Sequence, residues 1–128
     1  MKFIIDKVST LPAHALSISE IKALLRAIPA DWVRYVQTVH LKATLPKHSL
    51  FDRPVIYSSY SNRLNICSRG LSPQEARREI LREIAARKFV PSRTYNRLSK
   101  EELVQVDRII APYLSKFAGD DSLLVHRF

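Results

Sequence analysis

The sequence of 128 residues has few of the residue types from which several common functional sites are built. It contains two glycines, Gly70 and Gly119, so a glycine-rich loop that cradles phosphate groups cannot be formed. Cys67 is the single cysteine, which excludes a disulfide within the chain, and its apolar surroundings predict an inert packing residue. These absences exclude nucleotide-binding fingerprints and a disulfide-stabilised fold.

Long hydrophobic runs are also missing. No apolar run approaches the ~18 residues that a membrane span requires, and the first residues, MKFIIDKVST, are too polar for a secretory leader. Hydrophobic residues make up 46% of the chain and charged residues 26%, as in ordinary globular proteins. We expect a cytoplasmic protein without a membrane partner, folded as one domain over 1–128. Its core is expected over about 17–117, with an N-terminal arm or strand over 1–16 and a tail over 118–128.

Metal ligands and catalytic bases are sparse. The histidines are His14, His40, His48 and His126. No two of them have the spacing of a zinc site, although His40 and His48 remain a pair that the fold could bring together. Ser58 and Ser59 have no base nearby in the sequence, and no Gly-x-Ser-x-Gly turn is present. We therefore predict no bound metal, no cofactor and no catalytic residue.

What the sequence does contain is an excess of positive charge. The formal net charge is +9 and the isoelectric point is about 10.1. From Arg63 to Arg97 there are nine lysines or arginines against three glutamates, so pairing within this segment cannot neutralise it. A basic surface of this kind attracts phosphate backbones or acidic proteins.

Hydrophobic periodicity predicts three helices and a small sheet. Three capping boxes, each a serine followed three residues later by a glutamate, predict helices over 17–28, 72–89 and 99–117. Alternation with a period of two predicts strands over 36–44, 54–60 and 63–67, the last two as a hairpin, and a weaker one over 2–8. We therefore predict an α+β fold in which an antiparallel or mixed sheet of about three or four strands packs against three main helices.

The helix predicted over 72–89 carries two stripes. Ile80, Leu81 and Ile84 form one stripe, which should face the core. A second, mixed stripe, where a local function would be expected, consists of Arg78, Arg82, Ala85 and Phe89 beside a ridge of Glu75, Glu79 and Glu83. The plainer interpretation is a solvated face held by the ion pairs Glu75–Arg78, Glu79–Arg82 and Glu83–Arg87.

The order of these elements resembles a minimal zincin, the metallopeptidase-like fold. In that family a helix ending in Leu-x-x-Leu/Ile-Pro leads to a strand, a hairpin and then the active-site helix His-Glu-x-x-His. Here LRAIP at 25–29 precedes the strand over 36–44, the hairpin and the segment ILREIAA at 80–86. The resemblance covers about residues 17–117 and rests on element order and apolar pattern.

The resemblance breaks at the metal ligands. Aligning the two motifs retains the glutamate as Glu83 and places Arg82 and Ala86 where two histidines would bind zinc. A guanidinium is a permanent cation without a lone pair, and alanine offers no donor atom. The resemblance therefore implies a zincin-like fold without its zinc, in which Arg82 occupies the space of the ion and pairs with Glu83 or another carboxylate.

These features predict a non-catalytic basic binding module, resembling a zinc-less pseudo-metallopeptidase, that engages an acidic protein or a nucleic-acid backbone. Its candidate contacts are Arg63, Arg69, Arg77, Arg78, Arg87, Lys88, Arg93 and Arg97, with Tyr60 and Tyr95 stacking on unpaired bases. The plainer interpretation pairs these arginines with glutamates and places the tyrosines at the edge of the core.

Two alternatives remain open. A protein partner would be favoured by an exposed apolar patch, for which the candidates are Trp32, Phe51, Leu123, Leu124, Val125 and Phe128. The other alternative is a metal-dependent hydrolase with an unrecognised site, or an arginine-based hydrolase that uses Arg78, Arg82 and Glu83.

Overall fold

The structure is a computed structural model of the chain and describes residues 1–45, 53–90 and 98–118. The strands are β1 (Lys2–Ile5), β2 (Thr38–Leu41), β3 (Val55–Ser58) and β4 (Arg63–Ile66). The helices are α1 (Ile18–Ala27), α2 (Pro73–Phe89) and α3 (Lys100–Leu114), with the short 3-10 helices η1 (Ala30–Val33) and η4 (Ser115–Phe117). The predicted α+β class is confirmed, since the strands form a four-stranded mixed sheet accompanied by three α-helices.

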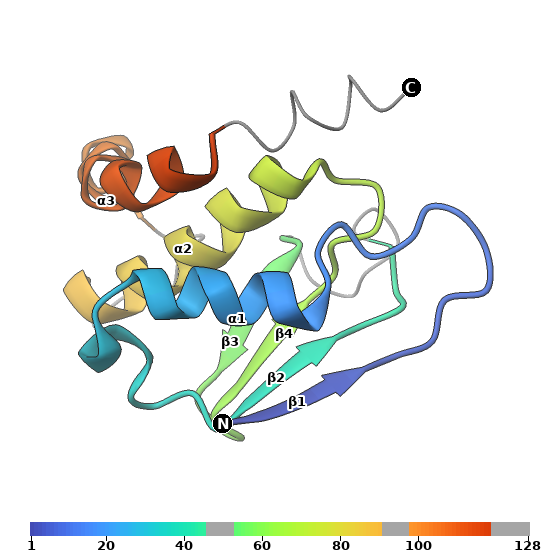
Figure 1. The fold of residues 1–128 in the computed structure, drawn as a ribbon. Coiled ribbons are helices and arrows are strands. Elements are labelled where there is room, and N and C mark those ends of the chain that lie inside the picture. The colour runs from blue at the N-terminus through green and yellow to red at the C-terminus, as the bar shows by residue number, and fades with distance from the viewer. Residues whose placement is uncertain (46–52, 91–97, 119–128) are drawn as a thin grey trace.

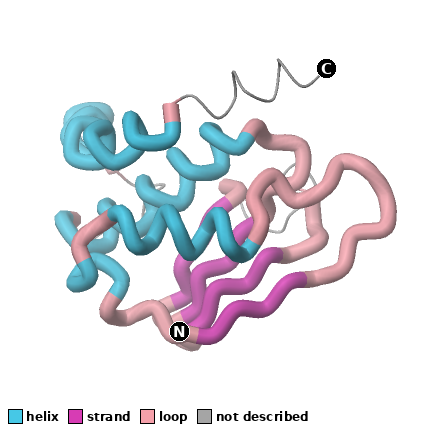
Figure 2. Tube along the Cα trace, viewed as in Figure 1, coloured by secondary structure: helices cyan, strands magenta, loops and turns pink. Residues whose placement is uncertain are grey.

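The sheet has the strand order β1-β2-β4-β3 (Figures 1 and 2). β1 runs parallel to β2 and β2 runs parallel to β4, whereas β3 and β4 form the predicted antiparallel hairpin. In register, Val39 lies opposite Phe3 on one side and Leu64 on the other, and Leu64 lies opposite Tyr57. Because side chains in register share a face, these residues build the apolar face of the sheet.

The α-helices lie on one side of the sheet, as Figure 1 shows, and α3 packs against α2. The core therefore fills the space between the sheet and the helices. Its most deeply buried side chains include Leu16, Ile21, Leu24, Val39, Leu41, Leu64, Ile66, Ile80 and Leu81. Cys67 is also buried, as predicted for a packing residue.

The helix starts follow directly from local sequence. Ser17, Ser72 and Ser99 each accept a hydrogen bond from the backbone amide three residues later, and the glutamate at that position accepts one from the serine amide. Each cap satisfies amides that the helix cannot pair internally, and is worth about 0.5–2 kcal/mol. All three predicted capping boxes are thus confirmed.

The strands are shorter than their alternating patterns. The strand predicted over 36–44 corresponds to β2, which spans Thr38–Leu41. It begins later than predicted because the amide of Val36 donates to the carbonyl of Val33, where the chain leaves η1. Val36 is nevertheless buried. The alternation of buried and exposed residues therefore extends beyond the hydrogen-bonded part of the strand. The pattern alone overestimates the length of the strand.

The second stripe of α2 is open only in part, and this corrects the sequence prediction. Ala85 of the stripe has 0% of its surface exposed and Glu83 of the ridge has 7%, whereas Arg78 and Phe89 are exposed. α2 packs against β3 as well as α3, so a helix expected to bury one face buries most of its circumference. Its small residues, which carry little periodic signal, make this close packing possible.

A polar network joins β1 to β2 and β4. His40 Nε2 lies 2.8 Å from Asp6 Oδ1, and His40 Nδ1 lies 3.3 Å from Arg63 Nη1. Because a guanidinium can only donate, Nδ1 must accept, so Nε2 carries the proton and donates to Asp6. The backbone amide of Ala43 donates to the other carboxylate oxygen of Asp6.

This network predicts a specific dependence of stability on pH. The hydrogen bond from His40, and more weakly that from Ala43, hold the pKa of Asp6 below its ordinary 3.8 against the effect of burial. Since the folded-state pKa is the lower one, the stabilisation is complete above pH 3.8 and is lost as pH falls through the folded-state value. We expect Asp6→Asn to be less stable than the wild type at neutral pH, and the difference to vanish in acid. Urea unfolding across pH measures this, and a difference that stays constant in acid would contradict it.

Candidate functional site

The positions aligned with zinc ligands are filled by structural contacts. The Arg82 guanidinium makes a two-point contact with Asp107 of α3, with Nε–Oδ1 at 2.7 Å and Nη2–Oδ2 at 2.9 Å. It also lies 3.3 Å from Glu79 Oε1, which confirms the predicted Glu79–Arg82 pair. Ala86 is buried. Arg82 therefore pairs with carboxylates other than Glu83 and ties α2 to α3.

Glu83 has a different partner from the one predicted. Its Oε2 pairs with Arg53 in place of Arg87, and its Oε1 accepts a 3.0 Å hydrogen bond from the backbone amide of Tyr57. Tyr57 belongs to β3, which is an edge strand, so Glu83 satisfies an amide that has no neighbouring strand. Both carboxylate oxygens are thus used to attach α2 to β3 and to the segment just before it.

Within the described ranges, no group of three or more histidine, cysteine, aspartate or glutamate side chains is placed to hold a metal ion. His14 contacts the carbonyl of Asp6, and His40 belongs to the network of Asp6 and Arg63. The proposed pairing of His40 with His48 lies outside the described residues. In the same part of the chain, no helix combines the length and hydropathy of a bilayer span.

Three of the predicted basic contacts serve the fold. Arg77 is 2% exposed, lies 3.6 Å from Glu20 and has its Cζ 4.9 Å from the Phe117 ring centroid. Arg63 contacts His40 as described above. Arg69 binds backbone carbonyls, with Nε 2.7 Å from Pro12 O and further contacts to Thr10 and Ala43. Arg77 in particular is removed from any surface that a partner could reach.

The remaining predicted contacts divide into two groups. Arg78 and Arg87 are exposed on α2, Lys88 is half-buried beside them, and Tyr60 is 98% exposed in the turn between β3 and β4. Arg93, Tyr95 and Arg97 lie outside the described residues. The structure therefore provides two exposed cations on α2 and one fully exposed aromatic ring from the predicted set.

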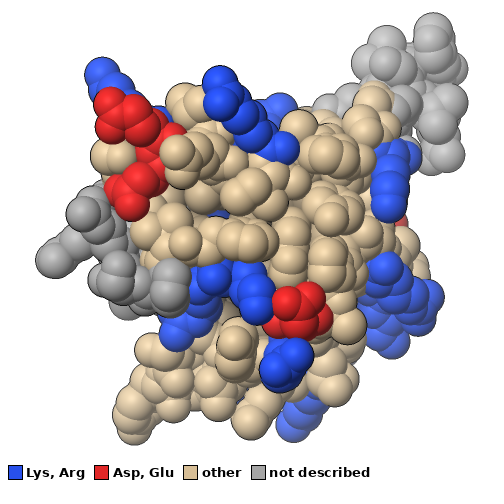
Figure 3. Space-filling model, turned by 90° about the vertical axis from the view of Figure 1, so that its left-hand side faces the viewer, with Lys and Arg blue, Asp and Glu red and all other residues tan. Residues whose placement is uncertain are grey.

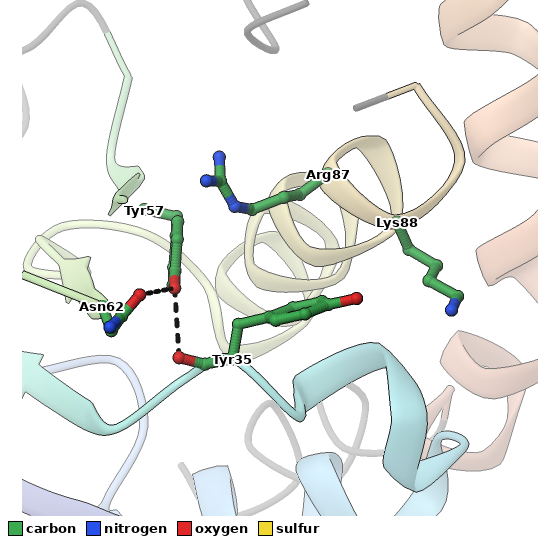
Figure 4. Close-up of a pocket in the computed structure, with 5 residues that line it drawn as sticks. All are labelled: Tyr35, Tyr57, Asn62, Arg87 and Lys88. Atoms are coloured by element: carbon green, nitrogen blue, oxygen red, sulfur yellow. Dashed lines mark hydrogen bonds between the residues drawn. The ribbon is translucent and has the colours of Figure 1, made fainter. Parts of the chain in front are cut away.

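Arg87 and Lys88 line a pocket of about 330 Å³ at the end of α2 (Figure 4). Tyr35, Tyr57 and Asn62 complete its lining. Arg87 Cζ lies 4.2 Å from the centroid of the Tyr57 ring, and Lys88 Nζ lies 3.0 Å from Asp31 Oδ2. The pocket thus combines two cationic side chains with two aromatic rings.

A hydrogen-bonded arrangement fixes the pocket floor. The Tyr57 hydroxyl lies 2.9 Å from Asn62 Oδ1 and 3.1 Å from the carbonyl of Tyr35, so it joins the β3–β4 turn to the segment after η1. Burial raises the pKa of Tyr57 above its ordinary 10.0, against the lowering effect of Arg87. Asn62 has φ 51°, a left-handed conformation that asparagine tolerates better than most residues.

A narrow recess behind the pocket reaches Glu83 but has a volume of only about 10 Å³. That is room for roughly one water molecule. Glu83 is 7% exposed, so little of its surface can be reached by a molecule in the larger pocket. The arrangement can hold an anion at its mouth, whereas its one acidic group is enclosed and committed to Arg53 and Tyr57.

Sequence reasoning missed three residues of this pocket. Tyr35 and Tyr57 follow no motif, because one lies in a short connection and the other on an alternating strand. Asn62 carried a faint signal, since asparagine in a short turn between two strands favours a positive φ. The meeting of these residues with the end of α2 depends on tertiary packing.

The apolar candidates for a protein partner are not supported by the described residues. Trp32 is buried and packs edge-on against Phe89 and Tyr113, with ring centroids 5.3 and 5.2 Å apart. Its assignment to an exposed patch is therefore wrong. Phe51, Leu123, Leu124, Val125 and Phe128 lie outside the described residues.

Figure 3 views the molecule from the left-hand side of Figure 1, where α2 ends beside η1. Lysine and arginine side chains are spread over this face, and acidic ones are fewer.

Comparisons of the chain with protein-family models, with curated proteins and with solved structures found no match.

Proposed function

We propose that this protein is a non-catalytic module that binds single-stranded nucleic acid through the basic and aromatic surface at the end of α2. We call this surface the α2 end and define it by Tyr35, Tyr60, Asn62, Arg87 and Lys88. The observation that carries the proposal is the placement of two basic side chains beside two exposed tyrosine residues. Cytoplasmic location and descent from a zincin-like enzyme that lost its zinc are parts of the same proposal.

The ion pairs of the fold support a positive exterior. In the pairs described above, the cations Arg53, Arg77, Arg82 and Lys88 take up the carboxylates of Glu20, Asp31, Glu79, Glu83 and Asp107. Four cations thus engage five carboxylates, so internal pairing does not reduce the net positive charge of the rest of the chain. Such a surplus favours a phosphate backbone, whose binding releases condensed counterions.

The exposed aromatic rings favour single strands over duplexes and over acidic proteins. Tyr60 is 98% exposed and lies two residues from Asn62, which lines the pocket, and Tyr35 is 50% exposed. An exposed tyrosine offers a flat surface on which an unpaired base can stack, whereas bases in a duplex are already stacked. An acidic peptide would use the cations but would gain little from these rings.

A salt titration tests the proposal. Labelled single strands of about 12 nucleotides, matching duplexes and polyglutamate are titrated with protein between about 50 and 200 mM salt. We expect the single strand to bind most tightly, with a slope of log K against log salt near −2 to −3 if three or four phosphates are contacted. Absence of strand binding at low salt overturns the proposal, and tighter binding of polyglutamate points to an acidic protein partner.

Tyr60→Ala provides a second, independent prediction. Loss of one stacked base should weaken single-strand binding by about 1–3 kcal/mol and leave weak duplex binding unchanged. Leu11→Ala is the matched control, because Leu11 is 89% exposed in the connection between β1 and α1. Figure 1 shows that connection at the opposite end of the molecule from η1. Equal effects of the two substitutions would show that Tyr60 does not stack on a base.

A further inference from the structure

The pocket at the α2 end offers hydrogen-bond donors in excess of acceptors. Its two floor acceptors, Asn62 Oδ1 and the Tyr35 carbonyl, both lie within hydrogen-bonding distance of the Tyr57 hydroxyl. The other polar groups of the lining are the Arg87 guanidinium, the Lys88 ammonium, the amide nitrogen of Asn62 and the hydroxyl of Tyr35. All four can donate, so the pocket is complementary to an anion that carries several acceptor oxygens.

Arg87 is the stronger of the two cationic contacts. Lys88 already shares its charge with Asp31, whose pKa it lowers by hydrogen bonding. Arg87 is exposed, and its Cζ lies 4.2 Å from the centroid of the Tyr57 ring, a cation–π contact that orients the guanidinium. A guanidinium held this way can donate two parallel hydrogen bonds to one phosphate.

The lining also provides a place for a planar ring. Figure 4 shows the Tyr35 ring below the end of α2, between the head groups of Arg87 and Lys88. Tyr35 is 50% exposed, so its side chain can be reached by a ligand. A volume of about 330 Å³ is at the lower end of the range for small-ligand pockets. The space suits a small ligand that has a planar ring and a charged group.

The helix end itself works against an anion, because the C-terminus of α2 carries the negative end of the helix dipole. This effect is smaller than that of a charge-assisted hydrogen bond, and Arg87 and Lys88 lie in the last turn, where they offset it. An anion here is therefore held by side chains and depends on Arg87.

We propose that this pocket binds one nucleoside phosphate, with its phosphate on Arg87 and Lys88 and its base on Tyr35. If the bound nucleotide is part of a single strand, the inference rests on the proposed function. A free mononucleotide carries the same chemistry, so the test separates the two sources.

The experiment titrates the full-length protein with adenosine 5′-monophosphate, adenosine, inorganic phosphate and a short glutamate peptide, and follows backbone amides by NMR. We expect the monophosphate to bind more tightly than either of its parts. The shifts should gather at Tyr35, Tyr57, Asn62, Arg87 and Lys88. Absence of these shifts at millimolar monophosphate overturns the inference without requiring any variant to fold.

Arg87→Gln and Tyr35→Ala should each weaken monophosphate binding by about tenfold or more. Arg78→Gln is the matched control, since it removes the same charge from an exposed position of α2 that does not line the pocket, and it should change affinity less than about twofold. Equal losses in Arg87→Gln and Arg78→Gln would show a diffuse charge effect and overturn the inference.

The two proposals fail separately. Monophosphate binding at the pocket without strand binding supports the pocket for a free nucleotide and overturns the proposed function. Strand binding that is unaffected by Arg87→Gln and Tyr35→Ala but weakened by Tyr60→Ala overturns the pocket and leaves single-strand binding by this protein standing. Glutamate peptide that shifts the pocket amides as strongly as the monophosphate overturns the assignment to a nucleotide.

Discussion

Replacing Glu83 by glutamine should lower the free energy of unfolding by about 3–5 kcal/mol. Glu83 and Arg53 have side-chain exposures of 8% and 14%, so their charges are largely removed from water. Glutamine keeps an oxygen that can accept from the Tyr57 amide but removes the charge that compensates Arg53. The cost arises because the largely buried Arg53 guanidinium then loses the Glu83 carboxylate, which offsets its desolvation. Urea unfolding followed by circular dichroism measures it.

Two further variants isolate this effect. Glu79→Gln removes the same charge from the same helix, but Glu79 and its partner Arg82 are 22% and 21% exposed, and Arg82 keeps Asp107. We expect it to cost about 1 kcal/mol or less. Replacing Arg53 by methionine together with Glu83→Gln should recover much of the stability, since both charges are then removed from the buried site. A Glu83→Gln variant as stable as Glu79→Gln would show that the buried pair contributes little.

Replacing Trp32 by alanine should cost about 3–5 kcal/mol. The indole lies in η1 and contacts Phe89 of α2 and Tyr113 of α3 edge-on, so one side chain joins three helical elements. Its removal loses both aromatic pairs and leaves a cavity that these rigid neighbours cannot close. Since Trp32 is the only tryptophan, unfolding of the variant is followed by circular dichroism rather than fluorescence.

Tyr60→Ala is the appropriate control for Trp32→Ala. It also removes a large aromatic side chain, but from a position that is 98% exposed, so the free energy of unfolding should change by less than about 0.5 kcal/mol. A small loss in Trp32→Ala would mean that the aromatic cluster does not hold η1 against α2 and α3. A large loss in Tyr60→Ala would mean that its ring contributes to the fold, which would also weaken its proposed role in stacking.

The candidate site was predicted in part. The charge excess and the cluster of basic residues on α2 could be recognised from composition, and Arg87, Lys88 and Tyr60 were among the predicted contacts. Arg77 was also among them, yet it is 2% exposed. Helical periodicity could not distinguish the buried Arg77 from the exposed Arg87, because α2 is packed on more than one side and its buried positions include an arginine and a glutamate. Burial of a charged residue depends on a partner elsewhere in the chain.

By itself the sequence determined the features that depend on neighbours along the chain. Helix starts at Ser17, Ser72 and Ser99 follow from contacts three residues apart, and the apolar faces follow from the periods of helix and strand. Only the tertiary structure decided which charges pair and where a pocket forms. Arg53 and Glu83 are 30 residues apart, and Arg82 and Asp107 are 25 apart, so their meeting depends on the path of the whole chain. The pocket likewise exists because η1, the β3–β4 turn and the end of α2 are brought to one place by a shared core.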